Sequence, residues 1–242
     1  MSYPKLEIEP GYLLGYHLTS EEHLCIRSWI RTQWEERILS VHPELTSVLP
    51  HISLREYHRL SERVVHEQLW AKEHRIFSKE QVDIFQQMSI FGRIREDLGD
   101  VSIADIEGLG YPEVYWRLVR PLPHIDVAVA HADTWFYQIT NNISEQRQKR
   151  LCKCWLSIHS TPESSGLAVH AGSHMQLWKY GAEERHGRPK PVFLDDPNRL
   201  NLQTLPLSDG DGVVFHTHLI HKGIAHRGNY TRYSIEFALE QN

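Results

Sequence analysis

The sequence predicts a β-fold decorated with helices, because helix-forming segments fill the first hundred residues and strand-forming segments follow. Capping-box motifs and helical spacing of apolar residues dominate the N-terminal part. Alternating runs rich in Val, Ile, Phe and Tyr, separated by turn residues, dominate the rest. We therefore expect a single domain over residues 1–242, with a mainly helical scaffold over 1–110 and a β core over 111–242.

Composition limits the classes of protein to consider. The chain has 242 residues, 40% hydrophobic and 24% charged, which is ordinary for a globular domain. Its net charge of −5 offers no basic field, so we expect no nucleic-acid or membrane partner. We see neither a membrane span nor a signal peptide at the start. Three cysteines, Cys25, Cys152 and Cys154, are too few for a disulfide framework, and we expect a cytoplasmic protein.

Three helices are predicted before residue 100, after an extended entry over 1–18. The first begins at the capping box formed by Thr19 and Glu22 and ends near Ser40. Its apolar stripe is Leu24, Trp29, Ile30, Trp34 and Ile38. The second spans about 53–71. The third begins at Ser78, which forms a capping box with Gln81, and stops at Gly99.

The later segments read as strands. These are VSIADIE (101–107), EVYWRLVRP (113–121), VAVAHADTWFY (127–137), CKCWLSIHS (152–160), SDGDGVVFHTHLIHKG (208–223) and YTRYSIEFALE (230–240). The proline-rich, charged stretch 175–206 is predicted to be a long surface excursion, and long loops of this kind are often functional lids.

The strand predicted over 127–137 carries the first candidate metal ligands. Side chains two apart on a strand share a face, so Val127, Val129, His131 and Asp133 line one face. A His and a carboxylate form two-thirds of the facial triad that holds non-haem Fe(II) and leaves open coordination positions. The chain must then supply a second His.

Four histidines crowd the region 216–226, namely His216, His218, His221 and His226. Strand alternation places His221 at the end of the apolar row Val213, Phe215, Thr217 and Leu219. His216 and His218 fall on the other face, and His226 lies past Gly223 in a connection. We therefore prefer His221 as the third ligand, with His216 as the next choice.

Arg232 and Ser234 lie on one face of the last predicted strand. A buried Arg needs an anionic partner, and a guanidinium matches a carboxylate bidentately. Pairing with Glu236 inside the protein is one interpretation. Beside a candidate iron triad, a carboxylate-bearing co-substrate is the sharper hypothesis, and we call Arg232 and Ser234 the carboxylate clamp.

With these residues in place, the chain resembles the phytanoyl-CoA dioxygenase-like family of Fe(II)- and 2-oxoglutarate-dependent oxygenases. The resemblance covers roughly residues 113–240 and rests on elements in the family's order. They are RLVRP before HADTWFY, CWLSIHSTPESSGLAVHAGSH, GDGVVFHTHLIHKG and TRYSIEF, with Arg232 eleven residues after His221. A second His-x-Asp copy, His124 and Asp126, lies beside prolines and is discounted. Ala171 departs from the family's usual Pro.

The resemblance implies a double-stranded β-helix of jelly-roll or cupin type, buttressed by the N-terminal helices. It implies that His131, Asp133 and His221 hold Fe(II), and that dioxygen takes the last open position. Because family members that halogenate replace the carboxylate by a small residue, the presence of Asp133 implies hydroxylation as the main outcome. The oxidation of an unactivated C–H bond would be coupled to conversion of 2-oxoglutarate to succinate and CO2.

The resemblance also implies that Arg232 and Ser234 bind the C5 carboxylate of 2-oxoglutarate and that Trp155 walls its pocket. A small-molecule substrate is expected, in a polysaccharide or secondary-product pathway. Trp135, Tyr137 and His174 are candidates for contacting that substrate, with core packing as the alternative for the two aromatic residues. Oligomeric state is left open between monomer and homodimer.

Two other functions compete. One is a protein that binds metal and 2-oxoglutarate without turnover. The other is a cupin-like isomerase, whose metal site would recruit an additional ligand such as His216 or His218.

Overall fold

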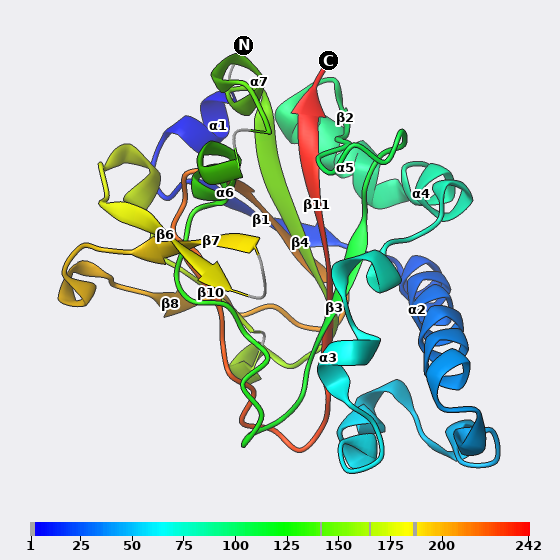
Figure 1. Cartoon of the computed structure of the whole chain (residues 1–242). Helices are drawn as coiled ribbons and strands as arrows, with labels where there is room; N and C mark the ends of the chain where they lie inside the picture. The colour runs from blue at the N-terminus through cyan, green and yellow to red at the C-terminus, as the bar shows by residue number, and fades with distance from the viewer. Residues whose placement is uncertain (1–2, 141, 165, 186–187) are drawn as a thin grey trace.

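A six-stranded antiparallel sheet forms the centre of the computed structural model, which describes residues 3–140, 142–164, 166–185 and 188–242 (Figure 1). Its order is β1-β9-β4-β11-β2, with β3 also paired to β11. The strands are β1 (Tyr12–His17), β2 (Val101–Ile103), β3 (Tyr115–Val119), β4 (Leu151–His159), β9 (Asp211–His216) and β11 (Arg232–Gln241).

Two smaller sheets complete the β-structure. One has the order β10-β5-β8, with β5 (Leu167–Val169), β8 (Gln203–Thr204) and β10 (His221–Gly223). The other is a hairpin of β6 (Tyr180–Arg185) and β7 (Arg188–Phe193). The stretch 175–206, predicted as an irregular excursion, therefore contains two paired strands, because the backbone groups of β6 and β7 bond one another.

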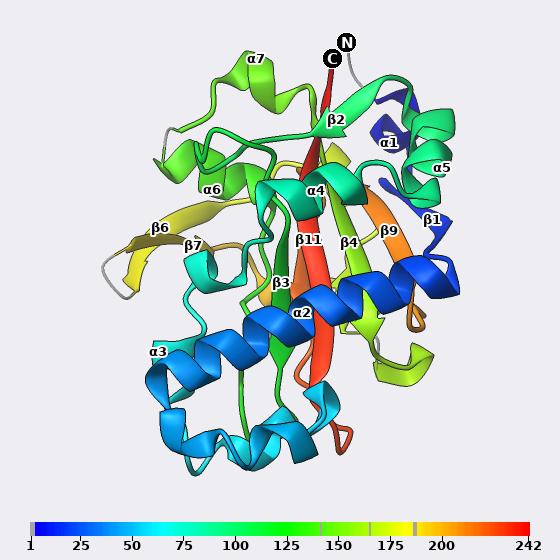
Figure 2. The same ribbon diagram turned by 90° about the vertical axis from the view of Figure 1, so that its right-hand side faces the viewer.

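The helices lie mainly on one face of the large sheet, where α2 crosses the strands (Figure 2). The α-helices are α1 (Pro4–Glu7), α2 (Ser20–Val41), α3 (His66–Leu69), α4 (Lys79–Phe85), α5 (Ser89–Leu98), α6 (Asp133–Thr140) and α7 (Glu145–Gln148). Short 3-10 turns span Pro43–Leu45, Leu49–His51, Leu54–Leu60, Lys72–Arg75, Pro162–Ser164, Ser173–Met175 and Pro197–Arg199.

Helix α2 confirms the first predicted helix. The Glu22 backbone N–H donates to Thr19 Oγ1 at 3.2 Å, and the Thr19 N–H donates to Glu22 Oε2 at 2.9 Å. The buried stripe is Ile26, Ile30, Trp34 and Ile38. Leu24 was wrongly placed in that stripe, since it lies off this row of four-residue steps and is 60% exposed.

The other two helix predictions need correction. Residues 53–71 form a 3-10 segment and the short α3 instead of one helix. Contacts from the distant Thr231, just before β11, compete with helical bonding there, because the Thr231 N–H donates to Arg55 O at 2.7 Å and the His58 N–H donates to Thr231 Oγ1 at 3.1 Å. The helix predicted from Ser78 to Gly99 is split into α4 and α5, while the stop at Gly99 is confirmed at φ +83°.

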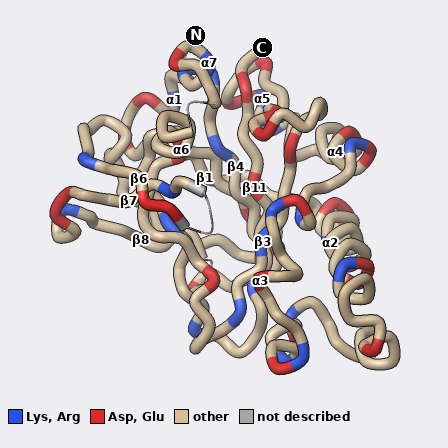
Figure 3. The backbone as a smooth tube through the Cα atoms, in the orientation of Figure 1, with Lys and Arg blue, Asp and Glu red and all other residues tan. Residues whose placement is uncertain are grey.

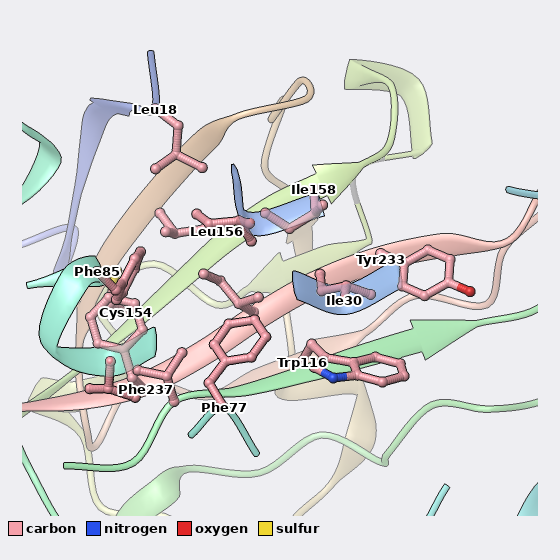
Figure 4. Close-up of a cluster of buried hydrophobic side chains, with 14 of the residues drawn as sticks. Leu18, Ile30, Phe77, Phe85, Trp116, Cys154, Leu156, Ile158, Tyr233 and Phe237 are labelled. Carbon is pink, nitrogen blue, oxygen red and sulfur yellow. The ribbon is translucent and has the colours of Figure 1, made fainter. Parts of the chain in front are cut away.

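Alternation along β4 and β11 separates two hydrophobic cores. Cys154, Leu156, Ile158, Tyr233 and Phe237 face the helices, as Figure 4 shows. On the opposite face, Trp155 packs with Val213 and Phe215 of the large sheet and with Leu167 and Val169 of the small sheet. The inner faces of the two sheets therefore pack together, and side chains on the inner face of the large sheet point between them.

Charges of both signs are interspersed along the chain (Figure 3). Among the described residues, no helix combines the length and the apolar character needed to cross a membrane.

Candidate metal centre

His131 and His221 meet through a short backbone bridge. The His131 N–H donates to His221 O at 3.0 Å, and the His221 N–H donates to His131 O at 2.9 Å. The bridge places the two imidazole rings 4.5 Å apart, measured between their centroids. Asp133 follows as the first residue of α6, which positions its carboxylate beside the histidine pair.

The prediction of a strand over 127–137 is wrong, although the structure brings its two ligand candidates, His131 and Asp133, together. Residues 127–130 have no regular structure, and Val129 is 43% exposed. The preceding segment is held by a side chain instead, since the Asp126 carboxylate accepts the Arg120 N–H at 2.9 Å and pairs with its guanidinium at 2.8 Å. The Asp126 carboxylate of the second His-x-Asp copy is therefore used in an ion pair with Arg120.

The metal triad, His131, Asp133 and His221, is compact. One ligand atom of each residue lies within 4.8 Å of the others, and His221 Nε2 is 4.0 Å from Asp133 Oδ2. All three residues are at most 9% exposed. No other group of three His, Cys, Asp or Glu residues in the described part of the chain has this metal-binding geometry.

The polar atoms of the triad are arranged to receive a cation. His131 Nδ1 lies 2.7 Å from Val129 O, and His221 Nδ1 lies 3.0 Å from Leu219 O. A carbonyl only accepts, so each Nδ1 carries a proton and each Nε2 is the ring nitrogen available to a metal. Burial lowers the pKa of His131 to about 4, which keeps it neutral. Asp133 Oδ2 is buried without a hydrogen-bond partner, so the site suits a divalent metal.

The other clustered histidines lie elsewhere. The strand predicted over 208–223 is broken into β9 and β10, and the turn between them carries His218. The His216 ring lies 5.3 Å from His218 and 5.2 Å from His174, and all three line a polar pocket of about 610 Å³. His226 is buried against Tyr230.

Arg232 is a buried cation without a carboxylate. It is 3% exposed, and its Nη2 donates to Ile224 O at 2.8 Å. Among the described residues, no Asp or Glu lies within 4 Å of it. The alternative pairing with Glu236 is wrong, because that carboxylate accepts from Tyr115 Oη at 2.7 Å and lies 3.3 Å from Arg117 Nε. Burial lowers the pKa of Arg232 to about 10, which still leaves it charged at neutral pH.

Gly166 makes room for the clamp, and sequence reasoning missed it. Its φ is +98°, and a Cβ there would collide with the Arg232 guanidinium. Only a glycine therefore lets the guanidinium occupy this position. The turn sequence before it (TPESS) was visible, but the contact with Arg232 depends on the fold. Ser234 lies on the same face of β11 as Arg232 and is 7% exposed.

The remaining predicted residues divide between core and pocket. Trp155 belongs to the cluster between the two sheets. Trp135 stacks on Tyr180 of the hairpin, with ring centroids 4.8 Å apart and planes 5° apart. Tyr137 packs in a third apolar cluster and is 5% exposed. His174 lies in the polar pocket described above, and none of the three triad residues lines that pocket.

Two histidines and one carboxylate on a scaffold of antiparallel sheets define the class of non-haem metal sites that suit Fe(II) oxygenases. The chain belongs to the phytanoyl-CoA dioxygenase (PhyH) family, whose model matches residues 52–234. Family membership supports a non-haem oxygenase, and the metal triad is a possible site for its metal. The matched region extends well into the helical part, beyond the resemblance visible in the motifs.

Solved structures support the fold. The apo structure of the non-heme monooxygenase ThoJ matches with a TM-score of 0.58 at 12% identity, covering 96% of this chain and 74% of that chain. The non-heme alpha ketoglutarate dependent carbocyclase SnoK from nogalamycin biosynthesis matches with a TM-score of 0.57 at 15% identity, covering 100% and 84%. EctD from S. alaskensis, with 2-oxoglutarate and 5-hydroxyectoine, matches with a TM-score of 0.52 at 14% identity, covering 100% and 76%. A search of curated proteins gives no significant match.

Proposed function

We propose that the protein is an Fe(II)- and 2-oxoglutarate-dependent dioxygenase that hydroxylates an unactivated C–H bond of a small molecule. One observation carries the proposal. The metal triad has an unpartnered carboxylate oxygen, and the same fold buries Arg232 without an acidic partner among the described residues. One feature calls for a cation and the other for an anion, and Fe(II) with 2-oxoglutarate satisfies both.

His131, Asp133 and His221 would hold Fe(II) through Nε2, a carboxylate oxygen and Nε2. When bound, iron supplies the oxygen chemistry, and decarboxylation of 2-oxoglutarate to succinate and CO2 supplies two of the four electrons that dioxygen takes up. The C–H bond of the substrate supplies the other two and becomes C–OH. The protein fixes the imidazoles through the Val129 and Leu219 carbonyls, which prevents the rings from turning.

The carboxylate clamp would bind the C5 carboxylate of the co-substrate. The guanidinium of Arg232 presents a fork of N–H donors, and the Ser234 hydroxyl can donate one more hydrogen bond. Trp155 would wall this pocket from the inner core. The two facing sheets support the double-stranded β-helix as the fold, with residues 1–242 forming one oxygenase domain.

Asp133 supports hydroxylation over halogenation, because its carboxylate fills a coordination position that chloride would need. Contacts of Trp135, Tyr137 and His174 with the substrate stay predictions, and the packing of the two aromatic residues favours support of the site over direct contact. A cytoplasmic location, a monomer or homodimer, and a role in polysaccharide or secondary-product pathways also stay predictions.

The test is co-substrate binding and turnover. Purified protein with Fe(II) and ascorbate should bind 2-oxoglutarate by calorimetry and release succinate only when both iron and 2-oxoglutarate are present. Absence of 2-oxoglutarate binding would refute the proposal. Tight binding without succinate, across a broad panel of small molecules, would favour the non-catalytic alternative.

A further inference from the structure

Lys153 is a largely buried lysine whose ammonium makes no hydrogen bond or ion pair with the described residues. It lies in β4, on the same face as Trp155, and is only 9% exposed. Within the described part of the chain, no hydrogen-bond acceptor or carboxylate lies within bonding distance of its Nζ. Its nearest aromatic contact is the ring of Tyr115, whose centroid is 5.5 Å from Nζ. A buried charge left in this state is costly unless a ligand or ordered water compensates it.

The surrounding carboxylates are already committed. Both oxygens of Glu236 are engaged, one by Arg117 at 3.3 Å and one by the Tyr115 hydroxyl at 2.7 Å. Asp133 belongs to the metal triad. Asp133 and Glu236 therefore attract the Lys153 ammonium electrostatically, but neither supplies a hydrogen bond to its three N–H groups.

The position of Lys153 connects it to the metal centre. Its cross-strand neighbour on β9 is Phe215, and the ring of Phe215 packs 4.8 Å from the ring of His221. Asp133 also acts electrostatically on Lys153 and helps to raise its pKa, against the opposing effect of burial. The ammonium therefore belongs to the inner surface beside the metal triad.

Lys153 is also separate from the carboxylate clamp. Its neighbour on β11 is Ala238, four residues beyond Ser234 along the strand. Four residues of strand span about 13 Å. A co-substrate held by Arg232 and Ser234 would therefore leave the Lys153 ammonium free for another ligand.

We propose that Lys153, together with Arg117, binds an oxyanion of the substrate, a carboxylate or a phosphate, beside the metal. Arg117 lies on β3 opposite Ser234, and its side chain extends toward Lys153, since Arg117 Cζ and Lys153 Nζ lie 5.9 and 5.5 Å from the centroid of the same Tyr115 ring. Its Nε forms an ion pair with Glu236, while 40% of its side chain is exposed. Its terminal nitrogens have no hydrogen bond among the described residues and can share the anion with Lys153. This inference rests on the proposed function, since it names the class of substrate for the same site.

The test uses small oxyanions, because they can enter a pocket of any shape. Protein loaded with Mn(II) and saturated with 2-oxoglutarate is titrated with acetate, methyl phosphate or neutral acetamide. Paramagnetic relaxation of the probe's methyl protons reports both binding and closeness to the metal. We expect at least one of the two anions to bind about tenfold more tightly than acetamide, and the better anion shows whether the group is a carboxylate or a phosphate.

Variants separate the possible causes of that preference. Lys153→Met should abolish it, Lys153→Arg should retain it, and the exposed Lys179→Met should leave it unchanged. An unaltered preference in Lys153→Met would overturn the inference, because the anion would then bind the metal directly. Weaker Mn(II) or 2-oxoglutarate binding in Lys153→Met would also overturn it, by assigning Lys153 to the triad or the co-substrate. If the unaltered protein binds neither Mn(II) nor 2-oxoglutarate, the proposed function itself fails.

Discussion

Replacing Arg232 by Met should separate co-substrate binding from metal binding. Met keeps much of the apolar stem of the side chain and removes the guanidinium. The metal triad makes no contact with Arg232, so its geometry should survive. The two backbone carbonyls that Arg232 contacts, Ile224 O at 2.8 Å and Ser164 O at 3.4 Å, lose a donor. The variant also loses a buried charge, so we expect its free energy of unfolding to change by no more than about 1 kcal/mol.

The expected loss of affinity follows from the contacts. A guanidinium that binds a carboxylate bidentately makes two charge-assisted hydrogen bonds, and Arg232 is 3% exposed, so water screens them little. Losing them should weaken 2-oxoglutarate binding by about 3 kcal/mol, or about 100-fold in Kd. The affinity for Mn(II) should change less than about threefold, a difference of under 1 kcal/mol.

Anaerobic calorimetry on Mn(II)-loaded protein measures both constants. The control is Arg227→Met, which removes an exposed Arg five residues earlier and should bind 2-oxoglutarate normally. The reasoning is refuted if Arg232→Met binds 2-oxoglutarate as tightly as the unaltered protein. It is equally refuted if Mn(II) binding is lost while 2-oxoglutarate binding is intact, since Arg232 would then support the triad.

Three further predictions concern the same region. Gly166→Ala should lower 2-oxoglutarate affinity at least tenfold in calorimetry and leave Mn(II) binding intact, because the new Cβ displaces the clamp guanidinium, whereas Gly92→Ala, with open space around it, should not. His221→Gln should weaken Mn(II) binding more than 100-fold and His218→Gln should not, measured by metal titration; equal losses would mean that the third ligand is misassigned. Glu236 has a pKa lowered to about 2, because attraction from Arg117 and Lys153 outweighs burial, which raises it. It should therefore stabilise the fold by about 3 kcal/mol above pH 4.5, a contribution lost as pH falls toward 2. Urea denaturation from pH 6 to pH 3 should show a steeper loss than in Glu236→Gln; parallel curves would contradict this.

Local chemistry was predictable from the sequence wherever neighbours along the chain decide the outcome. The start of α2 at Thr19 and the stop at Gly99 depend on hydrogen bonds and backbone angles within a few residues. Where distant contacts compete, the predictions failed. Residues 53–71 do not form one helix because Thr231 bonds their backbone.

The candidate site shows the same division. Face alternation selected His221 from four histidines, and the structure brings that residue to His131 and Asp133. Yet the alternation rule was applied to strands that do not exist as predicted. The three ligands come together through the backbone bridge between His131 and His221 and through the start of α6 at Asp133. No spacing along the chain reveals either feature.

The sequence by itself therefore determined which residue types carry the chemistry: a His-x-Asp pair, a distal His and an Arg-x-Ser pair in the family's order. Only the tertiary structure decided that Arg232 lacks an acidic partner, that Gly166 admits its guanidinium and that Lys153 is buried beside the triad. The physical reason is that burial and charge compensation depend on what lies across the sheet, and residues across the sheet are far apart in sequence.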